Sequence, residues 1–149
     1  MWKRSCGAIA VAGSVALSML GASQAWAWSS SSTARFDNGG TLTANIWVSS
    51  EFNMGSCNDF KSSAVSSIKP TWIKDAVDIH ATGFNVALHG AGATFSGANG
   101  HATVTNNRGQ TGAYLSGRVC AGLTAISVRY TATASALAYG NIRIASASV

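Results

Sequence analysis

The chain alternates apolar and hydrophilic residues over several stretches, and this period-two pattern restricts its fold more than any other feature. Residues 124–134 alternate almost without a break, and residues 41–48 follow the same pattern. Residues 76–89 alternate on both sides of Gly83, where we expect a bend. Successive side chains of a strand point to opposite faces of its sheet, so each stretch predicts a strand with one buried and one exposed face.

Three further stretches also predict strands, and glycine and asparagine separate them. These are residues 101–105, 113–120 and 141–148. Residues 106–109 (NNRG) favour a turn, because Asn and Gly tolerate a positive φ. In the last stretch Ile142 and Ile144 lie on the face opposite Ala145, so we expect only the first half of that strand to offer a strongly apolar face.

The remaining segments lack such alternation. Residues 28–34 are mostly serine and cannot build a core, so we predict a flexible lead-in. Residues 49–67 are rich in Ser and Asn and predict an irregular loop. Pro70 argues against a helix over residues 68–73. No segment after residue 27 shows sustained helical periodicity.

About six to eight short strands joined by Gly- and Asn-rich turns predict an all-β fold, namely a small antiparallel β-sandwich or barrel. Residues 35–149 suffice for a single β-domain of this kind and need no second one. An outer-membrane barrel has a related pattern, but it carries longer strands and more interfacial aromatic residues than we expect here.

The first 27 residues have the layout of a secretory signal peptide. Lys3 and Arg4 precede an uncharged stretch over residues 6–22, and residues 25–27 (AWA) form a small-x-small cleavage site. A membrane anchor is the alternative, but glycine and serine dilute the apolar stretch that a spanning helix needs. We therefore predict cleavage after Ala27, a secreted, extracellular protein, and no integral membrane span after processing.

Removal of the signal would leave two cysteines, Cys57 and Cys120. Exported proteins meet an oxidising compartment, in which an even pair normally forms a disulfide. The bond would close a loop of about 64 residues and contribute roughly 4 kcal/mol in the chain-entropy description. A redox pair needs a Cys-x-x-Cys motif and a zinc site needs further ligands nearby, and neither accompanies these cysteines. We predict a structural disulfide between them.

The charge of the chain gives no sign of a nucleic-acid partner. The formal net charge of +5 falls to +3 once Lys3 and Arg4 are removed. The other basic residues occur mostly singly, whereas nucleic-acid binders cluster them with stacking aromatic residues. We predict no nucleic-acid partner, although weak attraction to an anionic cell wall is compatible with this charge.

Tryptophan offers the best candidate contacts for a ligand. Trp47 lies on the hydrophilic face of the strand over residues 41–48, and an aromatic residue on a wet face often marks a platform for a sugar or a protein. Packing of Trp47 under a loop or in a second layer explains its position equally well. Trp72, close to Pro70, is expected to pack in the core or against a loop. We name Trp47 and Trp28 as candidate binding contacts.

No arrangement of side chains in the sequence amounts to a catalytic site. Asp78 and His80 share a strand face, as an Asp-oriented histidine base would, but no Gly-x-Ser-x-Gly motif accompanies them. Asp75 falls on the opposite face from Asp78, and we expect it to form a solvated surface pair with Lys74. The spacing of the three histidines matches no standard zinc pattern. We predict no catalytic residue, no metal site and no cofactor.

Two segments resemble parts of other exported proteins. Residues 68–75 (IKPTWIKD), with the small-residue strands after them, resemble uncharacterised small secreted β-domain proteins of actinobacteria, which implies no particular activity. Residues 101–107 (HATVTNN) resemble lactococcin-like bacteriocins, secreted β-sandwich peptides that act on the envelopes of competing bacteria. The cysteine pair departs from that family's pattern, and neither resemblance assigns a role to a residue of this chain.

Together these features predict a secreted, non-enzymatic binding or assembly domain that acts at the cell surface or in an extracellular complex. Its partner would be a protein or a cell-wall component. An antibacterial toxin, or a subunit of a secreted toxin complex, is the first alternative, and the bacteriocin resemblance supports it. A small secreted hydrolase that uses His80 as its base is the second alternative.

Overall fold

The structure, a computed structural model, describes residues 27–49, 55–82, 86–90, 95–97, 99–123 and 127–149. The predicted signal segment, residues 1–27, lies outside this part of the chain apart from Ala27. Ten strands follow one another along the described residues. They are β1 (Trp28–Arg35), β2 (Thr41–Val48), β3 (Cys57–Ser66), β4 (Trp72–Thr82), β5 (Val86–Gly90), β6 (Phe95–Gly97), β7 (Asn99–Asn106), β8 (Gly112–Ala121), β9 (Ser127–Ala138) and β10 (Asn141–Ser148).

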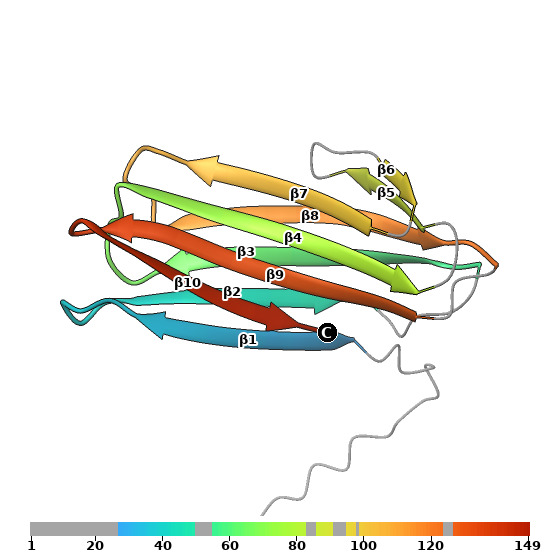
Figure 1. Ribbon diagram of the computed structural model, residues 1–149, viewed down its shortest axis with the longest axis horizontal. Coiled ribbons are helices and arrows are strands. Elements are labelled where there is room, and N and C mark those ends of the chain that lie inside the picture. Colours follow the sequence, from blue (N-terminus) through green and yellow to red (C-terminus); the bar gives the residue numbers. More distant parts are fainter. Residues whose placement is uncertain (1–26, 50–54, 83–85, 91–94, 98, 124–126) are drawn as a thin grey trace, which may run out of the picture.

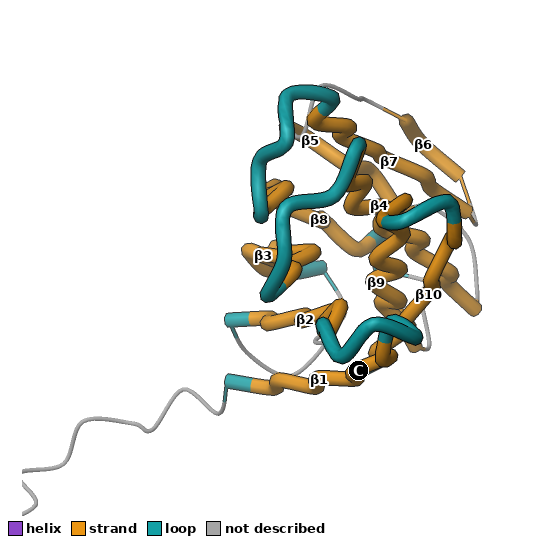
Figure 2. Tube along the Cα trace, turned by 90° about the vertical axis from the view of Figure 1, so that its left-hand side faces the viewer, coloured by secondary structure: helices purple, strands orange, loops and turns teal. Residues whose placement is uncertain are grey.

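The strands form two antiparallel sheets that pack face to face (Figure 1). The larger sheet has the order β1-β2-β3-β8-β5-β6, and the smaller sheet has the order β10-β9-β4-β7. Figure 2 looks along the strands and shows the two layers beside each other. The prediction of an all-β antiparallel sandwich is therefore confirmed.

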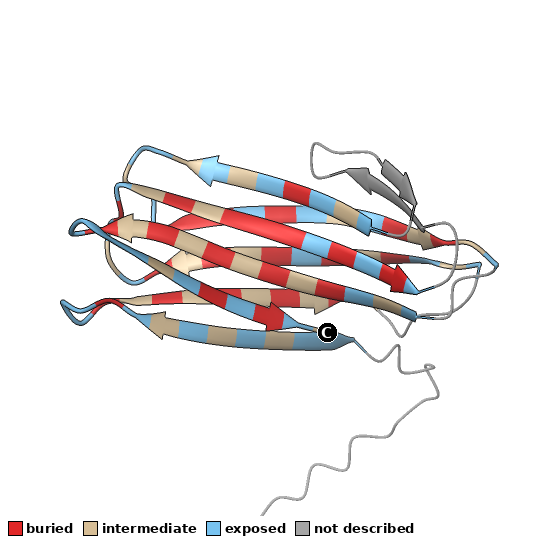
Figure 3. Cartoon of the chain, viewed as in Figure 1, coloured by how far each residue is buried: buried red, intermediate tan, exposed pale blue. Residues whose placement is uncertain are grey.

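The core lies between the sheets, where every second residue of the long strands is buried, as the bands of colour in Figure 3 show. The larger sheet contributes bulky side chains such as Leu42, Ile46 and Phe60. The strands β9 and β10 contribute mainly buried alanines: Ala132, Ala134, Ala136, Ala138, Ala145 and Ala147. Small side chains opposite large ones let the two layers interdigitate.

In β10 the buried face is not the one that the sequence suggested. Ala145 and Ala147 are buried, whereas Ile142 and Ile144 are 55% and 60% exposed. The register pairs Ala145 with the buried Ala134 of β9, and directly paired residues share a face of the sheet. The pairing with β9 therefore decides which face of β10 turns inward. The composition of β10 alone suggests the opposite face, because that face carries the two isoleucines.

The segment predicted to be an irregular loop contains β3, which pairs with β2 on one side and β8 on the other. Its inward face mixes apolar residues such as Phe60 with buried serines such as Ser62 and Ser66, and this mixture hides the alternation. The serines are satisfied because Ser62 donates to Asp75 and Ser66 donates to the carbonyl oxygen of Ile68.

Residues 28–34, predicted to be a flexible lead-in, form most of β1. This strand pairs with β2 along its whole length, and Ser31 Oγ donates a hydrogen bond of 2.8 Å to Asn45 Oδ1. An edge strand is held by backbone hydrogen bonds and cross-strand side-chain pairs, so a serine-rich segment can form one without supplying a core. Residues 28–34 are therefore part of the sandwich, as most of its edge strand β1.

The edge strands β1 and β10 lie side by side and close one long side of the sandwich (Figures 1 and 2). Arg143 of β10 joins them, since its Nε donates to the carbonyl oxygen of Arg35 at 2.9 Å. The same guanidinium forms an ion pair with Asp37, just beyond β1. These contacts cover edges that would otherwise expose unpaired backbone groups.

Asp75, expected at the surface beside Lys74, is fully buried between the sheets. Ser62 Oγ donates a hydrogen bond of 2.5 Å to its Oδ2, and Oδ1 has no partner among the described residues. Burial raises the pKa of Asp75 to about 6, although the hydrogen bonds from Ser62 and from the backbone of Leu115 oppose that shift. The expectation of a surface position rested on the rule that charged residues are seldom fully buried. It was wrong because the alternation of β4 turns the side chain of Asp75 toward the core.

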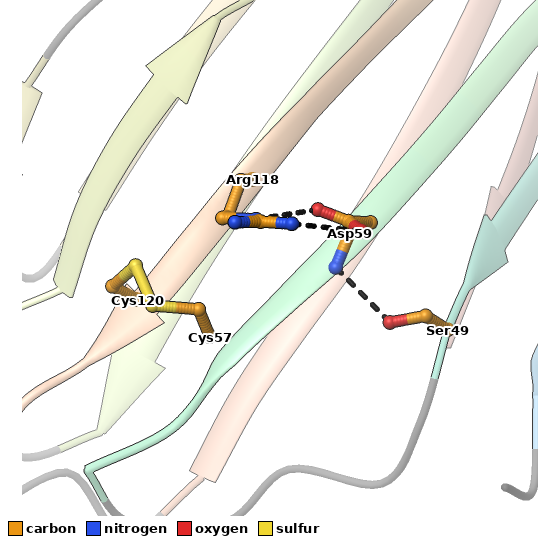
Figure 4. Close-up of polar contacts among 5 residues, drawn as sticks. All are labelled: Ser49, Cys57, Asp59, Arg118 and Cys120. Atoms are coloured by element: carbon orange, nitrogen blue, oxygen red, sulfur yellow. Dashed lines mark hydrogen bonds and ion pairs between the residues drawn. A yellow bond between two sulfur atoms is a disulfide. The ribbon is translucent and has the colours of Figure 1, made fainter.

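Cys57 and Cys120 form the predicted disulfide, with their sulfurs 2.03 Å apart (Figure 4). They face each other directly across β3 and β8. Close by on these strands, Arg118 donates hydrogen bonds of 2.7 and 3.2 Å to the two carboxylate oxygens of Asp59. The hydrogen bond from Arg118 lowers the pKa of Asp59, and the backbone N–H of Asp59 donates to Ser49 Oγ. A covalent bond and an ion pair thus join the central strands of the larger sheet.

Candidate binding groove

An open groove lies on the outer face of the larger sheet. It encloses about 530 Å³ and is lined by residues of β1, β2, β3 and β8. These strands are consecutive neighbours in the sheet, and adjacent antiparallel strands lie about 4.8 Å apart. The floor of the groove therefore measures about 14 Å across the four strands.

The register arranges the outward side chains of this region in two adjacent rows that run across the strands. The first row is Ser29, Trp47, Lys61 and Ser116, and the second row is Ser31, Asn45, Ser63 and Tyr114. Directly opposite side chains on one face of a sheet have Cβ atoms about 5 Å apart. Each member of a row is therefore within contact distance of the next.

Trp47, the first candidate contact, lines the groove. Its side chain is half-buried on the outer face, and the ammonium of Lys61 lies 5.5 Å from the centre of its ring. A cation at this distance is attracted to the electron-rich face of an indole. Of the two interpretations left open by the sequence, the structure supports exposure on the wet face.

Tyr114 is a second aromatic residue in the groove, and sequence reasoning missed it. Its side chain is 67% exposed. A Cβ added to Gly112 would lie 2.5 Å from the Tyr114 hydroxyl oxygen, so the end of the tyrosine side chain lies over Gly112. The signal was present, because Tyr114 occupies the hydrophilic face of its strand as Trp47 does.

A chain of hydrogen bonds joins three members of the second row, which ends at Tyr114. Ser31 Oγ donates to Asn45 Oδ1 at 2.8 Å, and Asn45 Nδ2 donates to Ser63 Oγ at 3.1 Å. Each hydroxyl has one hydrogen and two lone pairs, so Ser63 can accept this bond and still donate to another group. The floor is thus polar and held in a fixed orientation.

Trp28, the second candidate contact, is not among the residues that line the groove. It is half-exposed, and it pairs with Val48, whose side chain is buried, so it occupies the inner face of β1. Trp72 is half-buried beside Leu137 on the outer face of the smaller sheet, and not in the core. Of the tryptophans in the described residues, only Trp47 lines this groove.

Asp78 and His80 do not form the pair that a histidine base would need. The register of β4 and β7 places Asp78 opposite His101, and Asp78 Oδ1 lies 2.6 Å from His101 Nδ1. His80 bonds Asn99 on the same neighbouring strand. Asp78 and His101 are both 57% exposed, so this polar cluster lies on an open sheet face.

The described part of the chain brings no three His, Cys, Asp or Glu side chains together in a way that could hold a metal ion. The same residues contain no helix that is long and apolar enough to cross a membrane.

The chain matches no protein-family model, no curated protein and no solved structure with which it was compared. The resemblances seen in residues 68–75 and 101–107 therefore stay predictions. The geometry of the groove is what bears on function.

Proposed function

We propose that this chain is a secreted, non-enzymatic binding domain that acts at the cell surface, and that the groove around Trp47 is its contact surface. The proposal rests on the residues that line this groove. The groove holds two aromatic side chains, Trp47 and Tyr114, together with hydroxyl, amide and ammonium groups. Binding sites typically combine such aromatic surface with a few oriented polar groups.

The groove is built on strands, which favours binding without rearrangement. The side chains of Trp47, Lys61 and Tyr114 come from three hydrogen-bonded strands, and the disulfide joins two of these strands. A ligand that meets a preformed surface loses less free energy to ordering the protein. This arrangement suits a binding domain.

Two features support action outside the cytoplasm. The first 27 residues have the layout of a signal peptide. The disulfide between Cys57 and Cys120 is of the kind that persists in oxidising compartments. An extracellular binding domain would meet its partner at the surface of a cell.

Sedimentation with cell envelopes of the producing organism tests this proposal. The purified protein, expressed with its export segment, should co-sediment with the envelopes, and Trp47→Ala should weaken retention about tenfold or more, as truncation of a central aromatic contact does. Trp28→Ala is the matched control, because it removes a half-exposed tryptophan outside the groove. We expect it to bind as the wild type does.

Failure of the wild-type protein to co-sediment would contradict the proposed function. Equal losses in the two variants would contradict the assignment of the groove. Urea unfolding of both variants, compared with the wild type, shows whether each is folded under the conditions of the assay.

A further inference from the structure

Resting on the proposed function, we infer that the ligand of the groove is a polysaccharide that carries acidic groups. A sugar ring has two kinds of surface, because its faces expose C–H groups whereas its edge carries hydroxyls. A site for it needs flat aromatic surface for the faces and hydrogen-bonding groups for the edge. The groove presents both kinds within its two rows.

The aromatic residues provide the surface for the sugar faces. Trp47 and Tyr114 lie on β2 and β8, on either side of β3. The Tyr114 ring lies over Gly112 and is 67% exposed, so it offers a broad surface to solvent. Such rings supply contact area at a small cost in conformational entropy, because each has only two side-chain torsions.

The composition of the rows favours a polysaccharide over a protein partner. The core of a protein interface is enriched in apolar residues, whereas neither row contains an aliphatic side chain. Ser31, Asn45 and Ser63 instead present hydroxyl and amide groups, linked by hydrogen bonds of 2.8 and 3.1 Å. These groups can pair with sugar hydroxyls as donors or acceptors.

The charge of the groove favours acidic groups on the polysaccharide. Lys61 lies between the aromatic residues on β3, with its ammonium over the Trp47 ring. The nearest carboxylate along β3, Asp59, is held by two hydrogen bonds from Arg118. The ammonium of Lys61 is therefore placed to attract a carboxylate or phosphate on the ligand. The floor of about 14 Å has room for a short stretch of such a chain.

The first experiment asks whether the retained ligand is sugar or protein. Envelopes are treated with protease or with periodate, which cleaves vicinal diols of sugars, and are then used in the sedimentation assay. We expect retention to survive protease and to fall about tenfold or more after periodate. If protease abolishes retention and periodate leaves it intact, the inference of a polysaccharide ligand is overturned. The proposed function would still stand if Trp47→Ala weakens retention in the same assay.

The second experiment tests the acidic groups. Carbodiimide coupling of the envelopes to a neutral amine blocks carboxylates, and cold hydrofluoric acid removes phosphodiester-linked polymers. We expect one of these treatments to lower retention several-fold, which identifies the source of the charge. Lys61→Gln should reproduce that loss on untreated envelopes, and Lys61→Arg should restore retention. Unchanged retention after both treatments, or with Lys61→Gln, would overturn the role of charge.

Discussion

Replacing Asp75 by asparagine should remove a loss of stability that the wild-type protein shows as the pH rises towards neutral. The carboxyl is fully buried, and its Oδ1 has no partner in the described structure, so the ionised form is disfavoured in the folded state. Burial raises its pKa from 3.8 to about 6. Each pKa unit corresponds to about 1.4 kcal/mol, so ionised Asp75 should lower the free energy of unfolding by about 3 kcal/mol.

The sign of this effect follows from which state binds the proton. Well below pH 3.8, Asp75 is protonated in both the folded and the unfolded chain. As the pH rises from 3.8 to about 6, the unfolded chain loses its proton first, so stability falls, and it stays lowered above that range. Asparagine is neutral at every pH, and its amide oxygen can accept the hydrogen bond that Ser62 donates.

Urea unfolding at about pH 3 and about pH 7.5 measures the prediction. The free energy of unfolding of Asp75→Asn relative to wild type should rise by about 3 kcal/mol from the acidic to the neutral condition. Asp78→Asn is the control, because Asp78 lies exposed on the same strand, and its difference from wild type should change by less than about 1 kcal/mol. A difference for Asp75→Asn that stays constant with pH, or that falls towards neutral pH, would refute the reasoning.

Three further predictions concern the disulfide, the groove and the closed edge. Reduction of the Cys57–Cys120 disulfide, or replacement of both cysteines by serine, should lower the free energy of unfolding by roughly 4 kcal/mol. A urea unfolding curve that is the same with and without reductant would contradict this. Gly112→Ala should displace Tyr114 and weaken envelope retention about tenfold with little change in urea midpoint, because only the flexible end of the tyrosine must move. If Gly112→Ala is retained as strongly as the wild type, Tyr114 does not belong to the binding site. Arg143→Ala should speed hydrogen exchange of the β1 amides but not those of β4, and unchanged β1 protection would argue against its role in closing the edge.

Alternation located β2, β4, β7, β8, β9 and β10 at least in part from the sequence, whereas it missed β1 and β3. The strand β2 was predicted with its observed bounds, because its buried residues are all apolar. The strand β3 was missed because Ser62 and Ser66 occupy buried positions, and serine carries no signal of burial by itself. The strand β1 was missed because its stability comes from pairing with β2, which is a property of the pair and not of the serine-rich segment.

The candidate site was partly predictable for the same reason. An aromatic residue on the hydrophilic face of a strand can be recognised from alternation, which is how Trp47 was found. The rows that bring Lys61 beside it and Tyr114 onto the same face depend on the order β2-β3-β8, in which β3 and β8 are far apart in the chain. Alternation within one strand contains no information on which strand will lie next to it.

The order of the strands also bears on how the protein reaches its folded state. The pairing of β3 with β8 brings together Cys57 and Cys120, which are separated by 63 positions, and β4 pairs with β9 over a similar span. Chains dominated by such distant contacts fold slowly, because a long loop must close before the contact forms. Residues 28–149 contain no third cysteine, so oxidation within them cannot trap a wrong partner. Once formed, the bond keeps β3 and β8 together through later openings, and each refolding event then begins with one of the long-range pairings already made.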